Sequence, residues 1–274
     1  FRVDVARARS LSFWRHFLKK YPDKAWLAES YTEELASPMK NVPRDIPADL
    51  LRIGFDSVYG QFHIFNDMNG QDYQNYLMQN KSMIAGVGRE KSLIGSFMTH
   101  DDPSIMRHGG AMYSKLVGGL MLTQPDTNPY ILDGYFTGYP HSYDIFNWRK
   151  PVTGNHPDIG EFFQGVAKLR EQYGALFRQG TYVPLQVNNP NVIAFVRQLG
   201  NKSVLVLANK NVNAEERALI RIPSLKVNQK LKNIAPDYGD KSMFIVDDGQ
   251  IHAYPLAPGR FYMFDIDIAR QQGY

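Results

Sequence analysis

Apolar side chains in the first two-thirds of the chain alternate between short continuous runs and stretches with helical spacing. In Leu11–Tyr21, for example, Leu11, Trp14, Phe17 and Leu18 share one face of a helix. Short apolar runs bounded by Gly, Pro or Asp indicate strands. We therefore predict strands at 1–4, 25–29, 54–59, 93–99 and 130–132, and helices at 11–21, 48–53, 72–89, 111–122 and 159–177. Five successive strand–helix units favour a parallel sheet with right-handed crossovers.

The pattern changes after Gly180, where we predict no further helix. Strand-like apolar runs follow at 192–198, 203–208, 218–222, 243–246 and 261–266, and turn sequences such as Leu199-Gly200-Asn201-Lys202 separate them. This pattern is typical of a small antiparallel β-sandwich or barrel. The sequence thus predicts an α/β domain over 1–179 and an all-β domain over 180–274.

The composition narrows the class of protein. The chain has 274 residues, of which 43% are hydrophobic and 21% charged, as in an ordinary soluble globular protein. The net charge of +4 is spread along the chain without a Lys/Arg run, so we expect no nucleic-acid partner. No apolar run approaches the length of a membrane span, so we expect no membrane partner. The absence of Cys excludes disulfides and thiol catalysis and leaves the cellular compartment open.

Acidic residues stand at or just after the ends of three predicted strands. These residues are Asp4, Glu29 and Asp101, and His100 directly precedes the last of them. The carboxyl ends of parallel strands meet at one edge of a sheet or one mouth of a barrel. Glycoside hydrolysis with retention needs two carboxyl groups about 5–5.5 Å apart, one as nucleophile and one as acid/base. The pattern therefore favours a site for this chemistry.

Two of these acids have neighbours that suit such roles. Arg2 lies two residues before Asp4 on a predicted strand, so both side chains point to the same face. A guanidinium placed there holds the carboxylate ionised and oriented, as a nucleophile requires. An ordinary strand-end ion pair is the alternative interpretation. Trp26 and Leu27 give Glu29 a partly apolar approach, which favours the protonated form of a general acid.

Several segments, taken in order, resemble the conserved regions of the α-amylase superfamily, glycoside hydrolase family 13 and its close relatives. They are Phe-Arg-Val-Asp at 1–4, Leu-Ala-Glu at 27–29 and His-Asp at 100–101. The segment 120–127 resembles the Leu-Thr-x-Pro-Gly-Thr stretch that enters the last barrel strand, and the region from Gly180 resembles the C-terminal β-domain. The resemblance implies a (β/α)8 TIM barrel, represented here by about its last five βα units, followed by a small antiparallel β-sandwich domain.

The resemblance also implies a role for each matching residue. Asp4 would be the nucleophile, Glu29 the general acid/base and Asp101 the carboxylate that stabilises the transition state. Arg2 would support Asp4, and His100 would hydrogen-bond the sugar in the subsite before the scissile bond. Tyr31 and Tyr135 follow predicted strands, where they are candidates for stacking on glucose, with plain loop packing as the alternative.

The sequence departs from the family pattern at several places. Arg7-Ala8 stand where the family often has Lys-His, and Thr99 stands where an Asn usually precedes His-Asp. A complete barrel has eight strands in about 250 residues, whereas about 178 residues with five predicted strands precede the β-domain. We therefore expect an N-terminal half-barrel, in the same or another chain, as a partner. We expect no metal or cofactor in this segment, and any calcium ion in that N-terminal part.

The sequence supports three functional hypotheses. The first is a retaining hydrolase acting on α-glucan or maltooligosaccharide through a covalent glycosyl–Asp4 intermediate. The second is a transglycosylase of the glucanotransferase or maltosyltransferase type, in which a sugar rather than water resolves that intermediate. The third is a non-catalytic relative that binds glucan or a partner protein. An unrelated α/β hydrolase or dinucleotide enzyme is not favoured, because the chain has no Gly-x-Ser-x-Gly and no Gly-rich loop between a strand and a helix.

Overall fold

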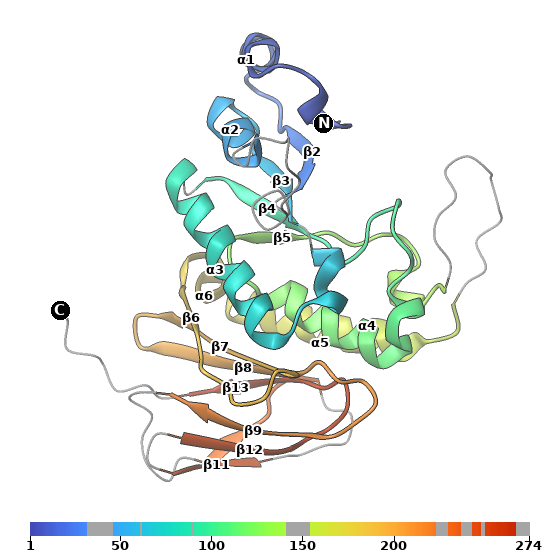
Figure 1. Ribbon diagram of the computed structural model, residues 1–274, viewed down its shortest axis with the longest axis vertical. Helices are drawn as coiled ribbons and strands as arrows, with labels where there is room; N and C mark the ends of the chain where they lie inside the picture. The colour runs from blue at the N-terminus through green and yellow to red at the C-terminus, as the bar shows by residue number, and fades with distance from the viewer. Residues whose placement is uncertain are drawn as a thin grey trace.

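The protein consists of a parallel α/β part followed by two antiparallel sheets. The computed structural model describes residues 1–31, 46–60, 62–88, 90–140, 154–222, 230–236, 243–247 and 250–266. Figure 1 shows the parallel sheet and the antiparallel sheets at opposite ends of the molecule, with helices α3, α4 and α5 between them. This arrangement confirms the predicted class, a partial (β/α)8 barrel followed by a β-domain.

The parallel sheet has five strands in their order along the chain. They are β1 (Arg2–Val3), β2 (Leu27–Tyr31), β3 (Ser57–Tyr59), β4 (Ser92–Gly95) and β5 (Thr127–Pro129). Every neighbouring pair in this sheet is parallel. The carboxyl ends of the strands therefore lie along one edge, as the sequence pattern predicts.

Within the described residues, six α-helices accompany these strands. They are α1 (Leu11–Lys20), α2 (Ile46–Ile53), α3 (Gly70–Val87), α4 (Met106–Thr123), α5 (Pro157–Gln172) and α6 (Gly174–Gln179). Side-chain caps begin two of them: Ser10 accepts from the Phe13 N–H, and Asn69 accepts from the Asp72 N–H. The single helix predicted at 159–177 divides at Tyr173, where the backbone leaves helical geometry and the hydroxyl donates to the Asp265 carboxylate.

Three predicted strands differ from the observed ones in position. The backbone N–H of Trp26 donates to the Asp56 carboxylate instead of joining the ladder, so β2 starts two residues later than predicted. Strand β4 ends at Gly95, because the Ser96 hydroxyl accepts from the Met98 N–H and turns the chain. Strand β5 lies three residues earlier than predicted, since Ile131 and Leu132 pack against the core instead of forming a strand.

The antiparallel part contains two four-stranded sheets. One has the order β13-β8-β7-β6 and consists of β6 (Thr181–Pro184), β7 (Val192–Leu199), β8 (Lys202–Asn209) and β13 (Phe261–Asp265). The other has the order β10-β11-β12-β9 and consists of β9 (Glu216–Arg221), β10 (Lys230–Lys232), β11 (Met243–Asp247) and β12 (Gln250–Leu256). The strands β6, β10 and β12 are not predicted from the sequence, because they are short or carry Pro and polar residues.

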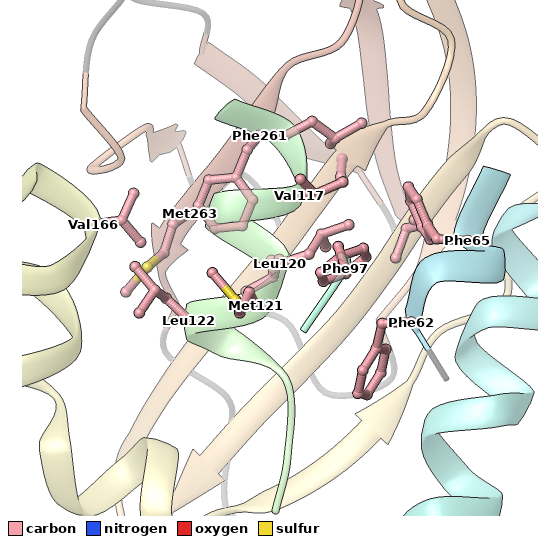
Figure 2. Close-up of a cluster of buried hydrophobic side chains, with 14 of the residues drawn as sticks. Phe62, Phe65, Phe97, Val117, Leu120, Met121, Leu122, Val166, Phe261 and Met263 are labelled. Atoms are coloured by element: carbon pink, nitrogen blue, oxygen red, sulfur yellow. The ribbon is translucent and has the colours of Figure 1, made fainter. Parts of the chain in front are cut away.

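One hydrophobic core joins the parallel part to the antiparallel part. Figure 2 shows apolar side chains of α4, among them Val117 and Leu120, close to Phe97 and to Phe261 and Met263 of β13. A Cβ atom at Gly119 would lie 2.4 Å from the Phe261 ring, so only Gly permits this close approach. A second core lies between the two antiparallel sheets. The α/β part therefore shares its main core with the β-domain.

The buried Arg197 of β7 reinforces this junction. Its guanidinium is bonded to backbone carbonyls of Thr123, Leu176, Phe177, Gly180 and Thr181, and the residue is 1% exposed. These carbonyls belong to the ends of α4 and α6 and to the start of β6. The negative end of a helix dipole favours a cation at this place. Burial lowers the pKa of Arg197 to about 10, so the side chain remains charged at neutral pH.

We predict that Arg197→Met lowers the free energy of unfolding by about 3 kcal/mol or more, because it leaves several buried carbonyls without donors. Chemical denaturation of the purified chain measures this loss. The matched control is Arg178→Met on the exposed side of α6, for which a change within about 0.5 kcal/mol is expected. Equal losses in the two variants would contradict the role of Arg197.

Candidate active site

The two faces of the parallel sheet have different neighbours. Ala28, Val58 and Leu93 are adjacent in register and belong to a core cluster with residues of α1, α2 and α3. Side chains that alternate with them along the strands point to the other face. That face carries Glu29 and Tyr59, and the acidic residues predicted to form a site lie along its carboxyl edge.

Arg2 links the two acids of the first two strands. Its Nη1 lies 2.6 Å from Oδ1 of Asp4, and its Nη2 lies 2.9 Å from Oε1 of Glu29. The backbone N–H of Val5 donates to Oε2 of Glu29 at 2.7 Å. The Glu29 side chain is 11% exposed, whereas that of Asp4 is 73% exposed. One guanidinium thus holds a shielded carboxyl and an open carboxylate side by side.

The surroundings of Asp4 favour its ionised form. A hydrogen bond from Arg2 is the largest cause that lowers the pKa of Asp4, and a hydrogen bond with the Glu29 carboxyl adds to it. The charge of His100 acts in the same direction. An ionised carboxylate that is open to solvent and fixed in direction is the form required of a nucleophile.

The residue after Asp4 has a strained backbone. Val5 has φ 43° and ψ 51°, the left-handed conformation, which is an outlier for a β-branched residue. This turn follows Asp4 directly and directs the Val5 N–H at Glu29. Strain of this kind persists only where the surrounding structure imposes it. Here the strained conformation of Val5 allows one turn of the chain both to present the Asp4 carboxylate and to donate the Val5 N–H to the Glu29 carboxyl.

The loop after β4 brings the third acid to the same edge. His100 Nε2 lies 3.4 Å from Oδ2 of Asp101, and its charge acts on Asp4. Thr99 holds this loop, because its N–H and its hydroxyl both donate to Asp102, at 2.8 Å and 2.7 Å. The Thr99 hydroxyl also accepts from the Asp101 N–H. Thr99 therefore organises the loop at the position where the family pattern usually has Asn.

Tyr31 lies within this group. Its ring centroid is 5.4 Å from that of Tyr59 and 5.6 Å from that of His63, and its hydroxyl is hydrogen-bonded to Thr99. Burial, followed by the negative charge of Glu29, raises the pKa of Tyr31 above its usual range. The structure thus brings together Arg2, Asp4, Glu29, Tyr31, His100 and Asp101.

Tyr135 does not belong to this group, and its prediction as a sugar-stacking residue is wrong. It begins the 3-10 helix η4 (Tyr135–Thr137), is 6% exposed and donates through its hydroxyl to the Ser114 carbonyl. Its ring lies 5.6 Å from that of Phe163 in the core. The apolar faces of α4 and α5 pack around this ring, so the alternative of plain packing is correct.

Tyr59 and Val5 are the residues of this edge that sequence reasoning missed. Tyr59 is the last residue of the strand predicted at 54–59. The position at the end of a strand, which selected the acids, could therefore have indicated Tyr59 as well. Val5 carried no signal, because a left-handed backbone at a Val is not visible in the sequence.

Two further findings concern the chemistry available to the chain. Within the part of the chain that the structure describes, no group of three or more His, Asp or Glu side chains is arranged to hold a metal ion. In the same residues, no helix is both long and apolar enough to cross a membrane.

Comparison with solved structures identifies the fold. The maltogenic α-amylase AmyB from Thermotoga neapolitana has a TM-score of 0.76 and 18% identity, with 98% of this chain and 61% of that chain covered. The α-amylase from Geobacillus thermoleovorans in complex with acarbose has a TM-score of 0.72 and 16% identity, with 99% of this chain and 60% of that chain covered. The debranching enzyme from Nostoc punctiforme has a TM-score of 0.68 and 16% identity, with 96% of this chain and 57% of that chain covered.

The chain therefore has the fold of these proteins over nearly its whole length and spans about 60% of theirs. The expected resemblance to α-amylases is confirmed at the level of the fold. No family model matches the sequence, and no curated protein matches it.

We predict that Val5→Gly leaves the free energy of unfolding unchanged or raises it by up to about 1 kcal/mol, because Gly adopts the left-handed conformation without strain. The control is Val183→Gly in β6, where the exposed fraction is similar (42% against 45%) but the backbone is extended. There a loss of about 1 kcal/mol is expected. Urea denaturation compares the variants, and an equal loss in both would show that Val5 is not strained.

Proposed function

We propose that this chain carries the catalytic carboxylates of a retaining glycoside hydrolase acting on α-linked glucose units. The observation that carries the proposal is the Arg2 bridge between Asp4 and Glu29, with His100 and Asp101 beside it. The similarity in fold to a maltogenic α-amylase and to an α-amylase bound to acarbose supports the choice of an α-glucan or maltooligosaccharide as substrate.

The bridge favours retention of configuration over inversion. A retaining pair lies about 5–5.5 Å apart, whereas an inverting pair leaves room for a water at about 6.5–9.5 Å. Because a single guanidinium contacts both carboxyl groups, the Asp4 and Glu29 side chains are held at short range. Such a short separation suits direct attack by a carboxylate better than attack by an interposed water, so Asp4 itself is the nucleophile in our proposal.

The proposed reaction has two steps. In the first, an Asp4 oxygen attacks the anomeric carbon while Glu29 protonates the departing glycosidic oxygen, which breaks the C–O bond and leaves a glycosyl ester on Asp4. In the second, Glu29 takes a proton from water, whose oxygen displaces Asp4 and releases the sugar. Asp101 stabilises the positive charge that develops on the sugar ring, and His100 hydrogen-bonds the sugar before the scissile bond.

A further segment of polypeptide completes the barrel in this proposal. Asp4 and Asp101 are exposed in the five-stranded sheet, whereas a substrate-binding mouth requires walls on all sides. The similar α-amylases are longer than this chain. We propose that strands from the same or another polypeptide close the sheet, and activity assays therefore use the protein that supplies them.

In that protein, we predict that Asp4→Asn lowers kcat on maltooligosaccharides by about 10⁴-fold or more, because it removes the nucleophile. Glu29→Gln is expected to lower turnover strongly as well. Asp23→Asn is the control, since Asp23 is an equally exposed Asp that pairs with Lys24 away from the site, and its kcat is expected to remain that of the wild type.

A fluorinated glucosyl donor provides a direct test of the intermediate. Mass spectrometry of the trapped protein is expected to find the label on Asp4, and a label on another residue would refute the assignment. Equal, negligible turnover by the wild type and by Glu29→Gln would instead favour a non-catalytic glucan-binding protein. Analysis of products separates a hydrolase, which releases reducing sugars, from a transglycosylase, which lengthens acceptor oligosaccharides.

A further inference from the structure

Arg2 needs an anchor other than the acids that it holds. Its side chain is 30% exposed, and one of its two carboxylate partners, Asp4, is largely open to solvent. A guanidinium has five N–H donors, and the two ion pairs use only some of them. Since exposed ion pairs alone fix side chains weakly, a rigid contact with the sheet is required to hold Arg2 in one orientation.

Tyr59 supplies such a contact from two strands away. It is the last residue of β3, is 2% exposed, and has its ring centroid 6.0 Å from Cζ of Arg2. Its hydroxyl accepts a hydrogen bond from the Arg2 guanidinium and is hydrogen-bonded to the hydroxyl of Tyr130, which directly follows β5. The rings of Tyr31 and Tyr130 pack on either side, with centroids at 5.4 Å and 5.9 Å.

An irregularity in the sheet makes this contact possible. Ala28 pairs with Val58, but the next pair is Tyr31 with Tyr59, so β2 has two additional residues, Glu29 and Ser30, between them. Such bulges redirect side chains and are frequent next to active sites. Here the bulge moves Tyr59 level with Tyr31, beyond Glu29, and the ring of Tyr59 lies 6.0 Å from Cζ of Arg2.

We propose that Tyr59, supported by Tyr130, is a positioning residue that orients Arg2 and thereby sets the relative placement of Asp4 and Glu29. The geometric part of this inference stands on the contacts of the chain itself. Its catalytic consequence rests on the function proposed above.

Burial, with smaller contributions from its neighbours, raises the pKa of Tyr59 to about 12, so its hydroxyl stays neutral over the working pH range and remains both donor and acceptor. Loss of this hydroxyl removes one of the groups that orient the Arg2 guanidinium and so loosens its placement. The hydrogen bond from Arg2 is the largest cause that lowers the pKa of Asp4, so a looser Arg2 raises the pKa of Asp4 towards its ordinary value of 3.8.

The first experiment is a titration that does not depend on enzymatic activity. The carboxyl groups of Asp residues are labelled with ¹³C in the full chain, and the Asp4 signal is assigned from its absence in Asp4→Asn. In the wild type we expect Asp4 to titrate below 3.8, and in Tyr59→Phe to titrate closer to that value. Tyr130→Phe, which retains the Tyr59 hydroxyl but removes its hydrogen-bond partner, is expected to give a smaller shift in the same direction.

Tyr73→Phe is the matched control. Tyr73 is as deeply buried as Tyr59, and its hydroxyl donates to Gln124 at 2.9 Å in the shared core, away from the site. We expect the Asp4 titration of this variant to be that of the wild type. An unchanged Asp4 titration in Tyr59→Phe, or an equal shift in Tyr73→Phe, would overturn the proposal, since the second result would indicate a general loosening of the fold.

The second experiment measures kinetics in the protein with the complete barrel. Tyr59→Phe is expected to lower kcat about 10–100-fold with little change in KM, because misplaced catalytic groups slow the chemical step more than they weaken binding. The acid limb of kcat/KM is expected to move to higher pH, in step with Asp4. Wild-type kcat together with an unshifted acid limb would contradict the role of Tyr59. Complete inactivity of the wild type would instead refute the proposed function, while the titration would still test Tyr59.

Discussion

The buried guanidinium of Arg197 links the end of α4 to the start of the antiparallel part. It meets carbonyls at the ends of α4 and α6 and at the start of β6, among them those of Thr123, Phe177 and Gly180. A planar cation with five N–H groups can satisfy several acceptors at once, which Lys cannot do in this geometry. Since α4 also supplies the centre of the shared core, the antiparallel sheets form a rigid base for the helix between β4 and β5.

A second guanidinium serves the opposite purpose at the other end of the molecule. Arg197 is enclosed and bonded to neutral carbonyls, whereas Arg2 is partly open and bonded to two carboxyl groups. The first arrangement stabilises the junction between the two parts of the chain. The second brings together acids from two different strands and keeps Asp4 ionised. The same side chain thus supports either the fold or the candidate site, according to the charge of its partners.

The candidate site is built from local departures from regular structure. The left-handed Val5 directs a backbone N–H at Glu29, the bulge in β2 brings Tyr59 level with Tyr31, and the Thr99–Asp102 turn presents His100 and Asp101. Each departure lies at the carboxyl edge of the sheet. The regular parts of the same strands, such as Ala28, Val58 and Leu93, pack against helices. Regular strands therefore supply the support, and irregular residues at their ends supply the functional groups.

The sequence by itself determined the class of fold and indicated the acidic residues of the candidate site. Hydrophobic periodicity predicted the parallel βα part and the later β-part. A helix buries the same face once per turn and a strand buries the same face at every second residue, so the spacing of apolar residues distinguishes the two. The position of acids after strands predicted that Asp4, Glu29 and Asp101 meet, since parallel strands share an edge. Only the tertiary structure decided that Tyr135 belongs to the core, that Tyr59 contacts Arg2, and where β2 and β5 begin and end. These outcomes depend on contacts between residues far apart in the chain, such as Trp26 with Asp56 and Tyr135 with Ser114, and local sequence patterns carry no information about such partners.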